Sequence, residues 1–212
     1  MKNEKVVIGA QEWAAKAVKI FARLFLGIRI YGTENLEALL KLQAQENCGV
    51  LMVSNHINAH DPFFVFACVP RAIRKIIFPI TFLGKEELFS TAFKRFVMDL
   101  FGVIPVSNDS GRNIRNVRTA LRRLKDGRVV FFFPEGAVSQ DGNLGEEQGA
   151  VNFFSHCTSF ILQPVRTSGI RSWNQDWLNI LLFRRKLEMR FGKPLLISKG
   201  EKIDVMEVIK SV

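Results

Sequence analysis

The chain has 212 residues, of which 48% are hydrophobic, and it carries a formal net charge of +10. This length fits one domain with a complete hydrophobic core. The positive charge favours an anionic partner, either nucleic acid or an acidic membrane face. Because the sequence has no aromatic RNA-binding strand pattern, no paired Cys/His spacing and no basic tail, we expect a membrane surface, no nucleic acid and no bound metal.

Residues 10 to 29 show helical periodicity, with an apolar face and a basic face. The apolar positions are Trp13, Ala17, Ile20, Phe21, Leu24 and Ile28, and the basic positions are Lys16, Lys19 and Arg23. A basic amphipathic helix that bears Trp and Phe is typical of an interfacial membrane anchor. An ordinary helix that packs on the core and solvates its basic face fits the pattern equally well.

Two short apolar runs, residues 49 to 54 and Val129 to Phe133, are predicted to be buried strands. The first leads to Asp61 and Pro62, where Asp is a favoured helix cap and Pro fits the first helical position. The second is stopped by Pro134. Two such junctions predict a single-domain α/β fold, with a central mixed, mostly parallel sheet flanked by helices and preceded by the amphipathic N-terminal helix. Ligands of open α/β sheets bind at the carboxyl ends of the strands.

The remaining elements follow the same periodicities. A helix is predicted over 112 to 125, a Gly-rich active-site loop over 136 to 149, a helix over 150 to 157 and strands over 160 to 165 and 186 to 191. A short final helix within 203 to 212 is expected to begin after Asp204. The 112–125 helix carries an arginine stripe, which either binds anionic headgroups or donor phosphates or is simply solvated; the stripe is Arg112, Arg115, Arg118 and Arg122.

The three cysteines, Cys48, Cys68 and Cys157, have no metal-ligand spacing and fit a reducing compartment. No signal-peptide core follows the first residues. No uncharged apolar run reaches the ~18 residues that a membrane-spanning helix needs. We therefore expect a peripheral membrane protein on the cytoplasmic face of the inner or plasma membrane.

His56 and Asp61 are expected to face each other across one tight loop, where a carboxylate can orient an imidazole and stabilise its charged form. With no serine or cysteine nucleophile signature nearby, such a histidine is predicted to act as a general base on a bound hydroxyl. Each residue alone also has a plain structural interpretation, Asp61 as a helix cap and His56 as a loop histidine. Their occurrence together with Glu135 favours catalysis.

Four blocks resemble the PlsC-type glycerolipid acyltransferases, in the order of that family. They are Asn55-His56 with Asp61, Gly84-Lys85-Glu86-Glu87-Leu88 with Gly102 to Val106, Phe133-Pro134-Glu135-Gly136, and Leu162-Gln163-Pro164-Val165. The resemblance covers roughly residues 30 to 196. It favours the membrane anchor over the core-packing helix for residues 1–30, and it predicts that residues 31–212 form an acyltransferase domain.

The resemblance implies transfer of a fatty acyl group from an acyl carrier protein or coenzyme A thioester to a lysolipid hydroxyl, without a cofactor. His56 would be the base and Asp61 its partner, while Lys85 and the backbone N–H of Gly136 would stabilise the oxyanion. Substrate-binding roles fall to five other residues: Asn55 and Gly84 within their blocks, Glu135 on the acceptor polyol, Pro164 at the donor site, and Arg112 on anionic groups.

Two departures from the family pattern bear on the acceptor. Ser107-Asn108 and Ala137-Val138 stand where the family usually has Asp-Arg and Thr-Arg. Both arginines expected to clamp an acceptor phosphate are therefore absent, although a phosphate monoester strongly favours bidentate arginine. We expect an acceptor without a glycerol-3-phosphate group, unless Arg112, Arg115 or Arg166 replaces the clamp. The alternatives are a thioester or lipid hydrolase on the same site, and an inactive membrane-binding relative.

Overall fold

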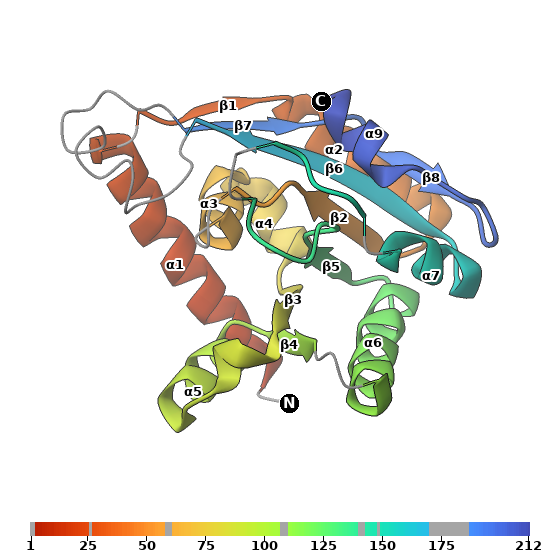
Figure 1. Ribbon diagram of the computed structural model, residues 1–212. Helices are drawn as coiled ribbons and strands as arrows, with labels where there is room; N and C mark the ends of the chain where they lie inside the picture. Colours follow the sequence, from red (N-terminus) through yellow and green to blue (C-terminus); the bar gives the residue numbers. More distant parts are fainter. Residues whose placement is uncertain are drawn as a thin grey trace.

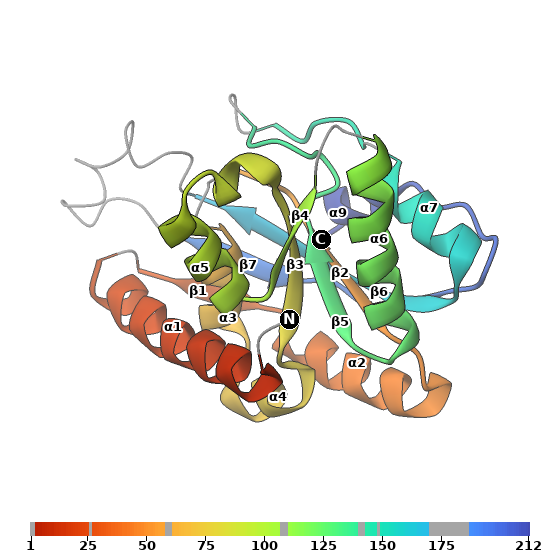
Figure 2. The same cartoon turned by 90° about the horizontal axis from the view of Figure 1, so that it is seen from below.

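The computed structural model describes residues 3–25, 27–57, 61–106, 110–139, 143–147, 149–169 and 187–212. A mixed sheet lies at its centre and helices cover both faces (Figures 1 and 2). The helices are α1 (Glu4–Phe25), α2 (Thr33–Glu46), α3 (Asp61–Cys68), α4 (Arg71–Ile77), η1 (Glu86–Phe89), α5 (Ala92–Leu100), α6 (Ser110–Lys125), α7 (Ala150–Cys157) and α9 (Val205–Lys210). The strands are β1 (Arg29–Tyr31), β2 (Val50–Ser54), β3 (Ile80–Lys85), β4 (Val103–Val106), β5 (Val129–Phe132), β6 (Phe160–Ser168), β7 (Glu188–Phe191) and β8 (Leu195–Ile197).

The strand order is β1-β7-β6-β2-β5-β3-β4, with β8 beside β6. The five strands β2 to β6 run parallel to one another, whereas β7 and β8 pair antiparallel with β6. The sheet is therefore mixed and mostly parallel, and the predicted α/β class is confirmed. Because β2, β5 and β3 are parallel neighbours, their carboxyl ends meet at one edge of the sheet.

Alternate residues of each central strand enter two separate cores, as the period of two in a strand requires. In β2, Val50 and Met52 pack with α1 to α4, while Leu51 and Val53 pack with α6, α7 and α9. All five residues of β2 are buried, which explains why its sequence is continuously apolar and does not alternate. The sheet is thus a rigid platform for whatever follows its strand ends.

The N-terminal helix differs from its sequence prediction at both ends. It spans Glu4–Phe25, so it begins earlier than residue 10 and ends before residue 29. Gly27 has a φ of 53°, a left-handed backbone conformation that suits glycine and stops a helix. Residues 29–31 then form β1, and Ile28 packs against the core, so it is not part of the outer apolar stripe.

Several other predictions hold to within a few residues. The 112–125 helix is α6, the 150–157 helix is α7, and the 160–165 strand is the first part of the longer β6. Asp204 caps α9, because its Oδ1 accepts from the backbone N–H groups of Met206 and Glu207 at 3.1 and 3.0 Å. Half of the arginine stripe, the side chains of Arg112 and Arg115, lies outside the described residues.

Candidate active site

His56 and Asp61 lie together just beyond the carboxyl end of β2. His56 Nδ1 is 3.2 Å from Asp61 Oδ2, and the same oxygen accepts the backbone N–H of Ile57 at 2.9 Å. The Asp61 carboxylate is almost fully buried in the first turn of α3, whereas the His56 side chain keeps limited exposure. Nδ1 points at the carboxylate; in the tautomer that donates from Nδ1 to this carboxylate, the opposite nitrogen, Nε2, is the one free to accept a proton.

The His56 ring is also held from one face. It stacks on Phe133, with ring centroids 3.8 Å apart and planes 10° from parallel. Phe133 follows β5, so the ring is fixed by contacts from both the β2 and the β5 ends. In the sequence, Phe133 stands out only as part of a motif; the stacking depends on β2 and β5 being neighbours, which no local signal reveals.

Glu135 joins two loops through hydrogen bonds to their backbones. Its Oε1 accepts the N–H of His56 and its Oε2 accepts the N–H of Gly145, each at 3.0 Å. The residue is only 8% exposed. The carbonyl oxygen of His56 in turn accepts the N–H of Ser139 at 2.7 Å. The backbone of the general-base candidate is thus held on both sides by the 133–139 segment.

Asn55 plays a similar bridging part toward β6. Its Nδ2 donates to the carbonyl of Thr167 at 2.8 Å, and its Oδ1 accepts the N–H of Thr167 at 2.7 Å. Both polar ends of this buried amide are used within the protein. In this conformation Asn55 fixes the base of the His56 loop to the neighbouring strand, and substrate contact by its side chain stays a prediction.

Lys85, Gly84 and Gly136 lie at the same sheet edge. Lys85 is the last residue of β3, the strand next to β5, and its side chain is exposed. Gly84 is packed tightly, since a Cβ there would come within 2.8 Å of Val103 Cγ1 on β4. Gly136 has a φ of 66°, and its N–H donates to the carbonyl of Phe133 at 3.0 Å. This N–H is therefore already engaged in a turn, and its role toward an oxyanion stays a prediction.

Pro164 and Arg112 are placed differently. Pro164 is buried in β6 opposite Val53, at the point where β8 has ended its pairing and β7 has not begun. A residue without an N–H suits this gap in the ladder. Pro164 also lines a pocket with Tyr31, Gly192 and other residues of the β7 side, while the Arg112 side chain lies outside the described residues.

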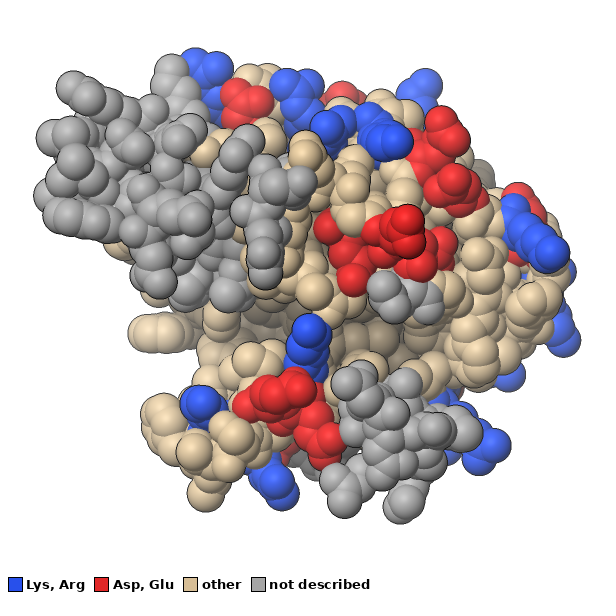
Figure 3. Space-filling model, viewed as in Figure 1, with Lys and Arg blue, Asp and Glu red and all other residues tan. Residues whose placement is uncertain are grey.

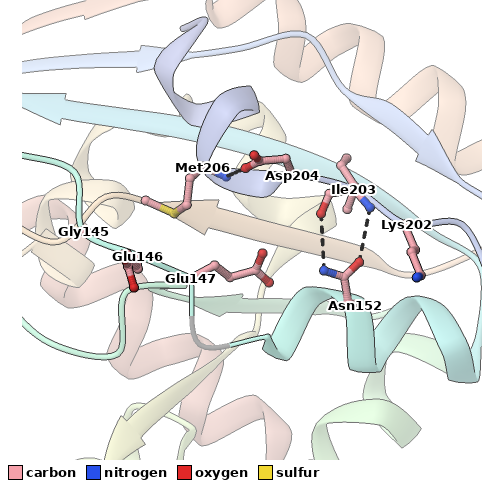
Figure 4. Close-up of a pocket in the computed structure, with 8 residues that line it drawn as sticks. All are labelled: Gly145, Glu146, Glu147, Asn152, Lys202, Ile203, Asp204 and Met206. Carbon is pink, nitrogen blue, oxygen red and sulfur yellow. Dashed lines mark hydrogen bonds between the residues drawn. The ribbon is translucent and has the colours of Figure 1, made fainter.

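A pocket of about 570 Å³ lies beside Gly145, the residue that donates to Glu135 (Figure 4). Three acidic residues, Glu146, Glu147 and Asp204, line it together with Lys202. Burial raises the pKa of Glu147, and the nearby charge of Asp204 raises it further, while the N–H of Val151 opposes both. Among the described residues, no group of three or more His, Cys, Asp or Glu side chains could hold a metal ion.

The fold and the site define an α/β protein with a His–Asp pair at the carboxyl ends of its parallel strands. A family model described as Acyltransferase matches residues 27–168, which is more than half of the chain. The chain therefore belongs to the acyltransferase family, as its motifs predict.

Named relatives agree with this assignment. The chain is 26% identical to the chloroplastic 1-acyl-sn-glycerol-3-phosphate acyltransferase of Arabidopsis thaliana over 87% of this chain and 49% of that protein. It is 24% identical to 1-acyl-sn-glycerol-3-phosphate acyltransferase of Bacillus subtilis over 87% of this chain and 81% of that protein. It spans half or less of the length of the two plant relatives with that name, including a 34% identical one from Brassica napus.

The fold matches the crystal structure of PlsC, the 1-acyl-sn-glycerophosphate acyltransferase of Thermotoga maritima. The TM-score is 0.66 at 18% identity, over all of this chain and 80% of that one. At this identity the likeness concerns the fold alone. A further relative, 27% identical over 61% of this chain and 52% of its own length, is named N-acylphosphatidylethanolamine synthase, from Arabidopsis thaliana. Membership of the family therefore does not by itself fix the acceptor.

Proposed function

We propose that this protein transfers a fatty acyl group from an acyl carrier protein or coenzyme A thioester to a lysolipid hydroxyl. The observation that carries the proposal is the His56–Asp61 pair, whose loop is hydrogen-bonded to Glu135 at the adjoining strand end. His56 Nε2 takes the hydroxyl proton as the acceptor oxygen attacks the thioester carbonyl. The tetrahedral oxyanion collapses, the C–S bond breaks, and the leaving thiolate takes from His56 the proton that came from the acceptor hydroxyl. The products are an ester and a free thiol.

Lys85 is our candidate for stabilising the oxyanion, because it stands at the end of the strand beside β5 and its cationic side chain is exposed. The Gly136 N–H remains a second candidate if the turn to Phe133 opens. The Glu135 carboxylate already accepts two backbone N–H groups, and this supports a positioning role. An acceptor hydroxyl could still donate to a remaining lone pair, so the predicted contact with the polyol is not replaced by this role.

The donor and acceptor of such a reaction bring the protein to a membrane, and α1 is the proposed contact. Trp13 is 70% exposed, and Ile20 and Leu24 are also largely exposed on the same side of the helix. The opposite side of α1 packs on α3 through Ala14, Ala15 and other residues. An apolar stripe left in solvent by an otherwise well-packed helix favours the interfacial interpretation over the core-packing one.

No helix among the described residues is long and apolar enough to cross a bilayer. We propose peripheral attachment to an anionic membrane surface, on the cytoplasmic face of the inner or plasma membrane, where acyl thioesters are available. Cys48, Cys68 and Cys157 are free thiols, in keeping with a reducing compartment.

We also propose that lysophosphatidic acid is not the preferred acceptor. Ala137 and Val138 are exposed beside Glu135, at one of the two positions where the family resemblance leads us to expect an arginine. The other, Asn108, lies outside the described residues. A dianion without matched cations loses hydration and gains little in return. A lysolipid with a neutral, zwitterionic or amino-acid headgroup is expected to be the better substrate.

Competition between lysophosphatidic acid and other lysolipids at equal concentration tests the acceptor. Preference for a headgroup other than the phosphate monoester would support the proposal, and Val138→Arg should then shift preference toward lysophosphatidic acid. A clear preference of the wild-type protein for lysophosphatidic acid would refute it and leave acyl transfer intact. Release of free fatty acid without an acylated lysolipid would instead establish the hydrolase alternative.

A further inference from the structure

Helix α5 is a nine-residue helix that buries none of its residues. Phe93 is 76% exposed and Phe96 is 54% exposed. Thr91 caps the helix, because its hydroxyl oxygen accepts the N–H of Lys94 at 3.2 Å. A helix this short has little stability of its own and usually depends on burial of an apolar face. In α5 the fold only half-buries Val97 and Leu100 and leaves Phe93 and Phe96 largely exposed, so its apolar face is suited to a surface outside the protein.

The residues of α5 are arranged for such a surface. Phe93, Phe96, Val97 and Leu100 follow helical spacing and form one apolar face, while the exposed charged residues Lys94, Arg95 and Asp99 lie on the other. Leu88, on the preceding η1, is also largely exposed. Large apolar groups flanked by cations are the composition of a helix that lies in the interface of an anionic bilayer.

The apolar face of α1 continues toward α5. Val7 of α1 lies against Gly102, just after α5, and Gln11 Nε2 donates to the Phe101 carbonyl at 2.9 Å. Successive residues of a helix lie about 100° apart around its axis. Viewed along this axis, Phe21, Ala17 and Leu24 of α1 lie between the directions of Val7 and Trp13, and all three are apolar. The two helices lie side by side in both views (Figures 1 and 2).

The other flank of α1 is charged and meets a different helix. Glu12 forms an ion pair with Arg74 of α4 at 3.2 Å, and Lys16 and Lys19 lie on the same flank. The exposed apolar stripe of α1 is therefore joined to α5 without an intervening charge and is separated from α4 by charged residues. In Figure 3 the surface at the place of α5 is mostly neither basic nor acidic, with both basic and acidic residues beside it.

We propose that α5 is a second membrane-inserting element, with Phe93, Phe96 and Leu88 entering the interface of an anionic bilayer beside the α1 stripe. This inference rests on the proposed function, since it supplies the surface from which a lysolipid would come. Lys94 and Arg95 contact anionic headgroups, each adding to binding near such a surface. Two attached helices fix the orientation of the protein on the bilayer, which one helix alone does not.

The position of α5 in the chain links this orientation to the candidate active site. η1 and α5 follow directly after Lys85, the oxyanion candidate at the end of β3. Insertion of α5 therefore holds this end of β3 close to the membrane surface, next to the strand end that bears Glu135. A lysolipid hydroxyl then reaches His56 without leaving the interface.

The test is co-sedimentation of the full chain with vesicles that contain phosphatidylglycerol. Phe93→Ser with Phe96→Ser should weaken binding by about tenfold or more while α1 is intact, since two aromatic groups are withdrawn from the apolar phase. The matched control is Phe153→Ser, because Phe153 is a 45% exposed aromatic on α7, a helix whose buried residues Val151 and Phe154 belong to the other core. Phe153→Ser is expected to bind like the wild type.

A second measurement reports directly how deeply α5 enters the bilayer. In Phe93→Trp, quenching by brominated lipid should exceed that of the wild type, while Phe153→Trp should add none. Equal binding by the double variant and the wild type, or no added quenching at position 93, would overturn the inference. If the double variant lost self-association but bound vesicles like the wild type, the inference would also be overturned, and the apolar face of α5 would instead contact a second copy of the chain. Turnover by the wild type on detergent-dispersed lysolipid tests the proposed function independently of any bilayer.

Discussion

Two regions of the molecule, the sheet edge at His56 and the face formed by α1 and α5, differ in how far their side chains are satisfied within the protein. At the sheet edge, nearly every polar group is held by another: Glu135 accepts from His56 and Gly145, and Asn55 is bound at both ends to Thr167. On the α1 and α5 face, large apolar side chains such as Trp13 and Phe93 are left in solvent. The first region is preorganised by internal contacts, whereas the second leaves large apolar side chains exposed to water.

This contrast fits the roles proposed for the two regions. A general base needs its ring fixed to within a fraction of an ångström, which internal hydrogen bonds and ring stacking provide. A membrane contact needs apolar area that the protein itself does not bury. Substitutions at the sheet edge should therefore alter turnover, and substitutions on the helical face should alter attachment.

The largest effect is expected from Asp61→Asn. The asparagine carbonyl can still accept the N–H of Ile57, but it cannot stabilise a charged His56 or keep its Nδ1 protonated as well. We expect turnover to fall by about 10²–10⁴-fold, with thermal unfolding showing a folded protein. Asp126→Asn, at an exposed loop position, is the control. Turnover of Asp61→Asn equal to that of the control would separate Asp61 from catalysis.

Glu135→Gln tests whether the sheet edge works by positioning. Glutamine has one acceptor oxygen and would leave either the His56 or the Gly145 N–H without its partner. Loss of a charge-assisted hydrogen bond should lower kcat by about 10–10²-fold, with little change in the KM of the acceptor. Glu146→Gln, an exposed neighbour, is the control. A raised acceptor KM at unchanged kcat would show that Glu135 mainly binds the acceptor.

Two isoleucines of nearly equal exposure test the helical face. Ile20 on α1 is 61% exposed and Ile76 on α4 is 62% exposed, but only Ile20 lies on the proposed membrane side. Ile20→Ser should weaken binding to anionic vesicles by roughly threefold to tenfold, whereas Ile76→Ser should not. Binding of the wild type should also weaken as salt is raised. Equal losses for both variants would remove the distinction between the two flanks of α1.

The smallest effect concerns Glu147, in the pocket beside Gly145. Because the pKa of its carboxyl is raised in the folded protein, folding favours the protonated form, and stability falls as pH rises above the ordinary pKa of 4.5. Glu147→Gln mimics the protonated form and keeps an acceptor for the Val151 N–H. We expect its Tm to exceed that of the wild type by about 1–3 °C at pH 8 and by nothing at pH 4. A lower Tm at pH 8 would give the carboxylate a stabilising role.

The parts of the fold that sequence predicted are those with strong local signals. The β2 and β5 runs are continuously apolar, and α6 has a clear stripe closed by Asp126 and Gly127. By contrast, α5 was not predicted, and only the structure shows that Phe93 and Phe96 on its apolar face remain largely exposed. β1 was absorbed into the predicted N-terminal helix, since three residues carry no usable period.

The same division holds for the candidate site. The pairing of His56 with Asp61 followed from their spacing in one loop. The stacking of His56 on Phe133 and the hydrogen bond from the His56 N–H to Glu135 could not be predicted, because they join residues nearly 80 positions apart through the order of the strands. Gly136 shows the reverse: the motif suggested a free N–H, and the turn to Phe133 occupies it.

Turnover of His56→Ala is the most direct test of the central claim, that a His56-centred site transfers acyl groups to a lysolipid. The measurement is formation of acylated lysolipid from a labelled acyl thioester by purified protein, with His156→Ala on α7 as the matched exposed-histidine control. The account predicts that His56→Ala remains folded and loses activity by at least about 10²-fold, while the control is unchanged. Activity of a folded His56→Ala within about threefold of the wild type would contradict it.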